Sequence, residues 1–160
     1  MLTFNQLYEA YAEEVYRFAF WLSGNHQWAD DITSETMIRA WTHFRPIRTE
    51  TLKAYLFTIA RNYYLGQLRK ENRLVDLDEE ILDPVQVPDT LIEHLDEIHQ
   101  ARKFVLTLPE CDRTAFILRV QHNTPYAEIA RVLEISESAA RVKVHRTRKK
   151  LTISRINPED

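Results

Sequence analysis

Glycine and cysteine are scarce in this chain of 160 residues, which contains two glycines and a single cysteine, Cys111. So little glycine favours helices over a turn-rich fold, and one cysteine cannot form a disulfide within the chain. No apolar run approaches the roughly 20 residues of a membrane span, and the N-terminus lacks the regions of a secretory signal. We therefore expect a soluble, cytoplasmic protein with no membrane contact of its own.

Residue patterns of enzymes and metal sites are also missing. The six histidines are scattered, no CxxC, HxxxH or HExxH spacing occurs, and two distant glycines cannot form a phosphate-binding loop. Asp31 and Glu35 lack a third ligand for a nuclease metal, and we interpret Cys111 as a bystander rather than a redox switch. The sequence predicts no enzyme, no cofactor and no metal site.

The net charge of −3 conceals an asymmetry along the chain. Residues 1–73 carry 9 basic and 8 acidic groups (+1), residues 74–100 carry 0 and 9 (−9), and residues 101–160 carry 12 and 7 (+5). The basic C-terminal part is typical of a nucleic-acid binder, whereas the acidic middle would be repelled by DNA.

Helical spacing of apolar residues predicts an all-α fold of two small helical domains joined by an acidic linker. In residues 1–73 we expect helices over 4–22, about 27–44 and from about 52 to 73. Residues 74–94 are the expected linker, and helices over 95–108 and 111–120 begin the second domain, 95–160. Apolar residues expected to face inward include Tyr8, Tyr63, Ile98, Val105 and Val120.

The segment 124–151 predicts a helix-turn-helix that closes the second domain. Thr124 is the expected cap of its first helix, with Pro125 at the first helical position. The pattern breaks at 134–136, where Ser136 can cap a second helix. From 141 to 150 that helix carries six Lys or Arg and no acid, and we find no acidic partners at four-residue spacing. A solvated charged hairpin is the alternative, but the single sign favours a helix in the DNA major groove.

A resemblance to a known family runs through nearly the whole chain. It is carried by LYEAYAEEVYRFAFWLSG, ADDITSETMIRAWTHF and AYLFTIARNYYLGQLRK in the first half, and by LPECDRTAFILRV and YAEIARVLEISESAARVKVHRTRKKL in the second. In this order, these segments resemble an extracytoplasmic-function (ECF, group 4) sigma factor of the sigma-70 family. The resemblance implies that residues 1–73 form region 2 and residues 95–160 form region 4. It also implies core RNA polymerase, promoter DNA and an anti-sigma factor as partners.

In the family, the second helix docks on the coiled coil of the largest polymerase subunit. Asp31 and Glu35, four residues apart, could pair with arginines of a partner, although such acids also suit a solvated helix face. We interpret Trp41 as more typical of the core than of an interface. The resemblance places the docking face at Asp30, Asp31, Thr33, Glu35, Arg39 and Trp41.

The third helix matches the part of the family that melts and reads the minus-ten promoter element. That task requires capture of an extruded base and a cationic track for the single strand. Tyr63 falls on the apolar stripe, whereas Tyr64 is offset by about 100° and is the expected stacking residue. Many family members carry an acid near Gly66, and its absence here leaves the base preference open. The candidate minus-ten residues are Lys53, Arg61, Asn62, Tyr64, Gln67, Arg69, Lys70 and Arg73.

The helix-turn-helix matches the part that reads the minus-thirty-five element. Family members often have Gly-Thr at 138–139 and Arg at 143, so the residues found here should alter sequence preference rather than docking mode. The side of the helix on which they lie places five residues near base edges: Glu137, Ser138, Arg141, Val142 and His145. Lys143, Arg146, Arg148 and Lys149 are expected on phosphates, and Ser136 completes the candidate set.

Two other classes of protein are compatible with parts of this pattern. A stand-alone helix-turn-helix regulator would not need the candidate docking face, and a helical adaptor that binds only protein would not need the basic cluster. The acidic linker has two interpretations as well: a solvated tether, or a segment attracted to the basic channel of the polymerase.

Overall fold

The structure is a computed structural model that describes residues 3–43, 49–75 and 89–156. These residues form helices α1 (Phe4–Ser23), α2 (His26–Thr42), α3 (Thr49–Val75), α4 (Asp89–Thr107), α5 (Glu110–Val120), α6 (Tyr126–Leu133) and α7 (Glu137–Ile156). No strand occurs within the described ranges, and no helix in them is both long and apolar enough to cross a bilayer. The predicted all-α fold is confirmed.

Helix α1 and the start of α2 are capped by residues that satisfy free backbone groups. Thr3 and Gln6 form a reciprocal capping box at the start of α1. Gly24 ends α1 in the left-handed conformation, with φ of 71°, and the side chain of Asn25 then accepts a bond of 3.0 Å from the Trp28 backbone to start α2. The turn at 24–25 therefore reverses the chain so that α1 and α2 pack against each other.

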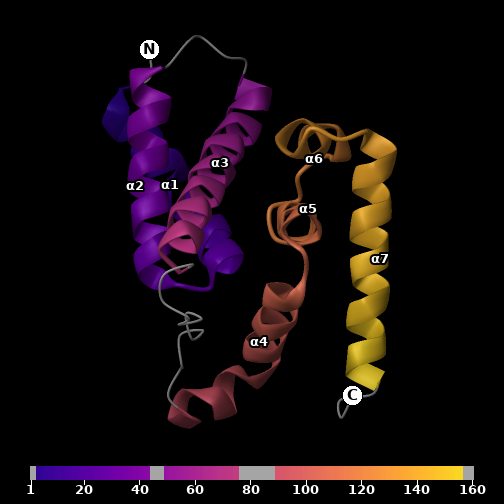
Figure 1. Cartoon of the computed structure of the whole chain (residues 1–160). Helices are drawn as coiled ribbons and strands as arrows, with labels where there is room; N and C mark the ends of the chain where they lie inside the picture. The colour runs from indigo at the N-terminus through magenta and orange to yellow at the C-terminus, as the bar shows by residue number, and fades with distance from the viewer. Residues whose placement is uncertain (1–2, 44–48, 76–88, 157–160) are drawn as a thin grey trace.

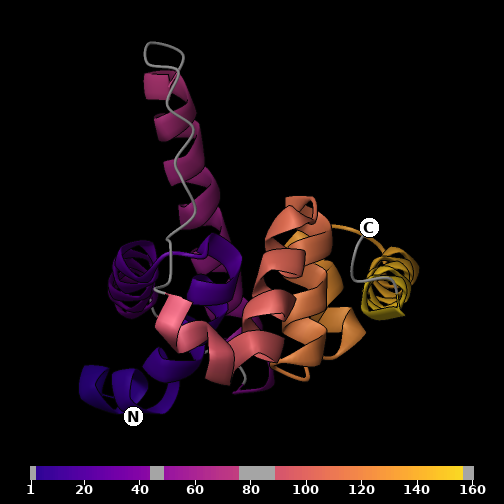
Figure 2. The same ribbon diagram turned by 90° about the horizontal axis from the view of Figure 1, so that it is seen from below.

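Helix α3 packs on α1 and α2 through its first half, and its C-terminal part projects from the body of the molecule as an arm (Figure 2). Leu52, Leu56, Phe57 and Ala60 on the first half are buried. Arg69 and Lys70 on the arm are exposed. The basic end of this helix is thus presented away from the core.

The remaining helices form the second half of the molecule, with α5, α6 and α7 on one side of Figure 1 and α4 below them. Helices α6 and α7 form the predicted helix-turn-helix. Glu134 takes the turn with φ of 57°, and Ser136 accepts a bond of 3.1 Å from the Ala139 backbone, as expected of a cap. Ala130 and Ala140 are buried where the two helices meet.

The expected cap at Thr124 is wrong. Helix α6 begins at Tyr126 with Pro125 as its cap residue. Thr124 is buried: its backbone N–H donates to the Leu118 carbonyl at 3.0 Å, and its own carbonyl accepts from Arg119 at 3.2 Å. The threonine therefore closes the turn after α5 instead of starting α6.

Several residues expected in the core lie at the surface. The exposed fractions are 46% for Tyr8, 55% for Ile98 and 48% for Val120. Helical spacing assigns these residues to an apolar stripe, but the stripe is wider than the contact each helix makes with its neighbours. Helix α4 also begins at Asp89, inside the expected linker; an acid as the first residue of a helix is favoured by the helix dipole.

The two halves are packed against each other. Helix α1 contacts α4 and α5, and α3 contacts α6. Most buried apolar residues of both halves belong to one continuous cluster. It includes Phe18 and Phe57 from the first half and Val105, Ile117 and Ile129 from the second. The contact between the halves is therefore part of the hydrophobic core.

Candidate nucleic-acid and polymerase interfaces

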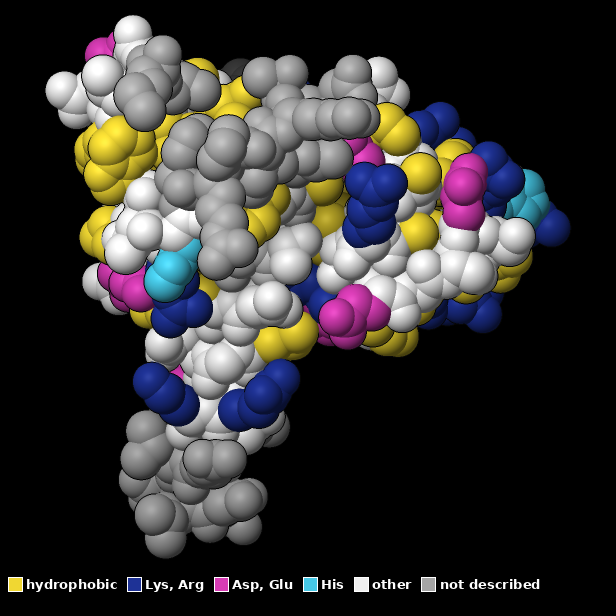
Figure 3. All heavy atoms as spheres, turned by 90° about the horizontal axis from the view of Figure 1, so that it is seen from above, with side chains coloured by type: hydrophobic (Ala, Val, Ile, Leu, Met, Phe, Trp, Pro, Cys, Tyr) yellow, Lys and Arg dark blue, Asp and Glu magenta, His cyan; other side chains and the backbone are white. Residues whose placement is uncertain are grey.

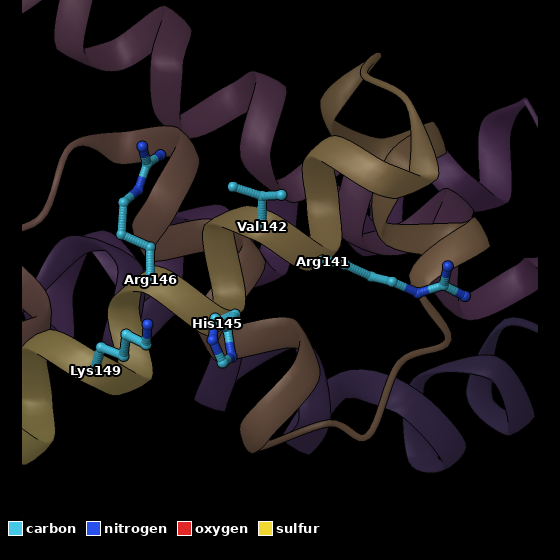
Figure 4. Close-up of a pocket in the computed structure, with 5 residues that line it drawn as sticks. All are labelled: Arg141, Val142, His145, Arg146 and Lys149. Atoms are coloured by element: carbon cyan, nitrogen blue, oxygen red, sulfur yellow. The ribbon is translucent and has the colours of Figure 1, made fainter.

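One face of α7 is open and basic. Arg141, Val142, His145, Arg146 and Lys149 are all exposed and line a shallow hollow along the helix (Figure 4). The opposite face buries Ala140, Val144 and Thr147 against the rest of the second half. Lys and Arg side chains gather on this side of the molecule in Figure 3. The helix therefore presents a cationic surface of the kind that binds nucleic-acid phosphates.

The charged residues of α7 do have acidic partners, contrary to the sequence expectation. Glu137 lies one turn before Arg141 and accepts a bond of 2.7 Å from its guanidinium. The same guanidinium lies 5.4 Å from the centre of the Tyr126 ring. An arginine held by a carboxylate and an aromatic face is restricted in orientation before it meets a ligand.

Lys143 is less accessible to solvent, and so to a ligand, than the other basic residues of α7. It is half-buried, and its Nζ lies 3.4 Å from Asp112 Oδ1 of α5. Arg146 reaches the same oxygen at 3.4 Å but stays exposed. Lys143 thus helps to hold α7 on α5. The remaining candidates of this set, Ser136, Glu137, Ser138, Arg148 and Lys149, are exposed.

The candidate docking face on α2 is mostly open. Asp30 and Asp31 are exposed, and Glu35 accepts a bond of 2.9 Å from the exposed Arg39. Thr33 does not belong to this face, because it is 5% exposed and its hydroxyl donates to the Ala29 carbonyl at 2.6 Å.

The interpretation of Trp41 as a core residue is wrong. Its side chain is 41% exposed, and its ring meets the Phe4 ring edge-on at a centroid distance of 5.9 Å. The ring therefore extends the docking face towards the start of α1.

On α3, the expectation that Tyr64 is the outward stacking residue is wrong. Tyr64 is 5% exposed, its ring packs against Trp28 at 5.7 Å, and its hydroxyl accepts a bond of 3.1 Å from Arg113 of α5. Burial raises the pKa of this phenol. Tyr63 is the less buried of the pair, with Arg39 5.2 Å from its ring centre. Trp28 of α2 and Arg113 of α5 thus cover the side of α3 that periodicity assigns to solvent.

Arg61 is also held by the second half. Its guanidinium donates to both carboxylate oxygens of Glu110, Nε to Oε1 at 2.6 Å and Nη2 to Oε2 at 2.8 Å, and Nη1 reaches the Val132 carbonyl of α6 at 3.4 Å. The hydrogen bond to Glu110 raises the pKa of Arg61. Burial opposes ionisation of Glu110, but bonds from Arg61 and Thr114 outweigh it and lower the pKa of this carboxyl.

The other candidates on α3 are open to solvent to different degrees. Lys53 is exposed and lies 3.2 Å from Glu14 of α1. Asn62, Arg69 and Lys70 are exposed and Gln67 is partly exposed. The side chain of Arg73 lies outside the described part of the structure.

Comparison with known proteins decides the family. A model of sigma-70 region 2 matches residues 7–74 and one of sigma-70 region 4 matches residues 98–151. The chain is 32% identical over 137 residues to the ECF RNA polymerase sigma factor EcfG of Rhodopseudomonas palustris, covering 84% of this chain and 75% of that protein. It belongs to the ECF sigma factors of the sigma-70 family.

Other relatives agree with this assignment. The sigma factor is 26% identical over 155 residues to the ECF RNA polymerase sigma factor SigM of Bacillus subtilis, covering 94% of this chain and 93% of the relative. Its fold matches that of the sigma factor RpoE of Bartonella quintana, solved in complex with the anti-sigma factor NepR, with a TM-score of 0.79, 24% identity and 98% of each chain covered. As an ECF sigma factor, it is a non-enzymatic factor that directs transcription initiation through regions 2 and 4.

Sequence reasoning about this sigma factor missed the residues that join its halves. Glu110, Arg113 and His122 make polar or buried contacts with the first half. One signal was present: Glu110 and Arg113 are charged residues at the start of α5, which also carries the apolar run 115–118. Their partners could not be read from the sequence, because those partners lie 49 to 108 positions away.

Proposed function

We propose that α7 places its exposed basic face in the major groove of a duplex minus-thirty-five element. The observation that carries this assignment is the row of exposed residues Arg141, Val142, His145 and Lys149 on one side of α7. The opposite side of the helix buries Ala140, Val144 and Thr147. Arg141 and Val142, near the N-terminal end of α7, contact base edges, and Arg146, Arg148 and Lys149 contact phosphates. Lys143 has mainly a positioning role through Asp112.

The open face of α2 is the proposed contact with core RNA polymerase. Asp30, Asp31 and Glu35 present three carboxylates along one helix, and exposed Trp41 adds an aromatic group. Carboxylates that meet arginines form bidentate bonds, which fix orientation as well as adding affinity. Thr33 is excluded from this surface by its burial.

The solvent-exposed side of α3 is the proposed contact with the minus-ten strand. Lys53, Asn62, Arg69 and Lys70 supply exposed donors and charge along the helix. Tyr63, which is partly exposed, replaces Tyr64 as the stacking surface available in this conformation. Arg61 remains a candidate contact, and it becomes available only when its ion pair with Glu110 opens.

Two further properties follow from the family. The relative of known structure is bound to an anti-sigma factor, and we infer that this sigma factor is held by an anti-sigma factor of its own. Because core polymerase and promoter DNA are the partners of a sigma factor, we place its action in the cytoplasm.

The assignment is tested by adding purified protein to bacterial core RNA polymerase and measuring binding and promoter-dependent transcription. Asp31→Ala combined with Glu35→Ala should weaken polymerase binding. Glu9→Ala combined with Glu13→Ala, on α1, is the control with the same change of charge. Equal binding by both double variants would remove the α2 face from the proposal.

A further inference from the structure

We propose that Gly66 is a specificity-determining residue of the minus-ten surface, because it opens a site on α3 where an unstacked purine base lies directly against the helix. The inference rests on the proposed contact between α3 and the minus-ten strand. It adds which class of base that surface accepts at one position, and which residue of this chain decides the choice.

Nothing in the described part of the structure requires a glycine at position 66. Gly66 lies in the interior of α3 and does not have the positive φ of Gly24. An added Cβ would have no neighbour within 4 Å. Alanine would therefore fit, and it would favour the helix, because glycine loses more conformational freedom on folding. A residue that weakens its own helix without serving its packing points to a contact made outside the chain.

Four side chains surround this bare stretch of helix. On an α-helix, the neighbours of a residue on the surface lie three and four positions away. For Gly66 these neighbours are Asn62, Tyr63, Arg69 and Lys70, of which Tyr63 is partly exposed and the others are exposed. Gly66 is thus the floor of an open site with an aromatic ring at one edge and polar groups around it. We call these five residues the Gly66 site.

The Gly66 site lies on the side of α3 that does not pack on the core. Ala60 and Tyr64 are buried, and Gly66 lies about 120° and about 160° from them around the helix axis, at 3.6 residues per turn. In Figure 3, Lys and Arg side chains lie on both sides of the arm that projects at the lower left, with white atoms between them. A single strand can therefore reach the site while cationic side chains contact its phosphates.

Tyr63 gives the site an aromatic edge that is held in place. The Arg39 guanidinium of α2 lies 5.2 Å from the centre of the Tyr63 ring, and Glu35 holds this arginine through a bond of 2.9 Å. Every base can stack on an aromatic ring, and a purine has the larger face. A base gains this contact only if it comes close to the helix. The missing Cβ lets it approach about 1.5 Å closer than alanine would.

The polar groups of the Gly66 site match the acceptors of a purine. Asn62 and Arg69 both carry N–H donors, and both kinds of side chain recognise N7, an acceptor that purines have and pyrimidines lack. An acid would instead accept from the N4 amine of cytosine, and none of the four neighbours of Gly66 is acidic. The site therefore selects a purine: adenine if Asn62 makes the contact, and guanine if Arg69 does.

The test uses the full chain assembled with bacterial core RNA polymerase. The probe is a pool of fluorescent DNA duplexes that end in a short single-stranded tail of randomised sequence. Sequencing of the bound fraction gives the base preference at each position, and fluorescence anisotropy gives the affinity for one selected sequence. Gly66→Ala adds one methyl group to the site. Asn72→Ala is the matched control, because it places the same residue at an exposed position of the same helix, outside the site.

We expect the parent complex to prefer a purine about ten-fold at one position, as a single good base contact allows. Gly66→Ala should lose this preference and bind the selected sequence about ten-fold more weakly, although its urea midpoint rises because α3 is more stable. A 7-deaza analogue of the selected purine lacks the N7 acceptor. It should weaken binding by the parent and leave binding by Gly66→Ala unchanged. Asn72→Ala should behave as the parent does.

The outcomes separate failure of the site from failure of the minus-ten contact itself. If Gly66→Ala keeps the parent's affinity and preference while Arg69→Ala with Lys70→Ala weakens binding of every sequence, the site is overturned and the contact of α3 stands. If neither variant changes binding, both are overturned. An equal loss in Asn72→Ala would show that stiffness of the helix, not space at position 66, controls binding. A parent that prefers a pyrimidine, or that is insensitive to the 7-deaza analogue, overturns the purine assignment.

Discussion

Helices α3 and α7 both carry basic residues that are candidates for DNA contact, but they differ in what packs against them. Other helices cover only one face of α7. Arg141 lies on the open face, where it stays exposed and pairs with Glu137 of the same helix. Helix α3 lies between α1 and α2 on one side and α6 on another, so Arg61 is enclosed and paired with a residue of the other half. The same type of side chain is thus available on one helix and withheld on the other.

This difference predicts that substitutions in the interface change stability, whereas substitutions on α7 change function. The largest stability effect is expected for Arg113→Ala. The substitution leaves the carbonyls of Leu22 and Leu108 and the hydroxyl of Tyr64 without their donor, and each buried group left unsatisfied costs about 1–3 kcal/mol. We expect a decrease of about 3 kcal/mol in the free energy of unfolding, measured by urea denaturation. A loss below that of the exposed-site control Arg131→Ala would show that Arg113 is not structural.

On α7, Arg141→Ala should reduce promoter-specific transcription about ten-fold or more, because one bidentate contact to a base contributes about 1–3 kcal/mol. Run-off transcription with reconstituted polymerase measures the effect. Core polymerase binding and the urea midpoint should be unchanged, since this side chain is exposed. A parallel loss of polymerase binding would contradict the separation of the two surfaces.

Substitution of the two glycines should have smaller effects on stability, and each substitution serves as a control for the other. Gly24 has a positive φ of 71°, and an added Cβ would lie 2.9 Å from Leu106 Cδ1 of α4, so Gly24→Ala should cost about 1–2 kcal/mol. Gly66 has no neighbour within 4 Å of an added Cβ and lies inside α3, so Gly66→Ala should gain about 0.5–1 kcal/mol. Thermal unfolding of both variants checks the signs. Equal effects of the two substitutions would show that neither the positive φ nor the contact with Leu106 makes position 24 sensitive.

The smallest expected effect concerns Val142, an apolar residue that is 58% exposed among basic neighbours. Such a side chain can contact the methyl group of a thymine in the major groove. Replacing the contacted thymine by uracil removes one methyl group, worth about 0.8 kcal/mol or about four-fold in affinity. Duplex binding by the polymerase complex should show this loss at one position of the element. Val142→Ala should abolish the sensitivity, and a protein insensitive at every thymine would remove this contact.

The elements of this fold could be predicted because their signals are local. Ser136 caps α7 as expected from residues within one turn. Gly24 ends α1 in the left-handed conformation that glycine adopts readily, and Ala140 and Val144, four residues apart, both lie on the buried face of α7. The resemblance, confirmed by the family models, identified the two sigma regions. The expected helix cap at Thr124 was wrong because this residue forms hydrogen bonds in the turn after α5 instead of capping α6.

Burial on α3 could not be predicted, because it depends on a surface contributed by distant residues. Periodicity distinguishes one face that packs from one that does not, and it assigns Tyr64 to the outward side. Here Trp28 of α2 covers the Tyr64 ring, and α5 and α6 of the second half add contacts on the same side. Conversely, Tyr8 and Trp41 lie on apolar stripes but have too few neighbours to be covered.

Seven helical segments, the helix-turn-helix, the distribution of charge and the family can all be derived from the amino-acid sequence, because each depends on neighbouring residues or on their order. Only the tertiary structure decided that the halves share one core and that Arg61 pairs with Glu110. Those contacts join residues 49 positions apart. Their energy comes from burial and mutual desolvation, which arise only when the two halves meet.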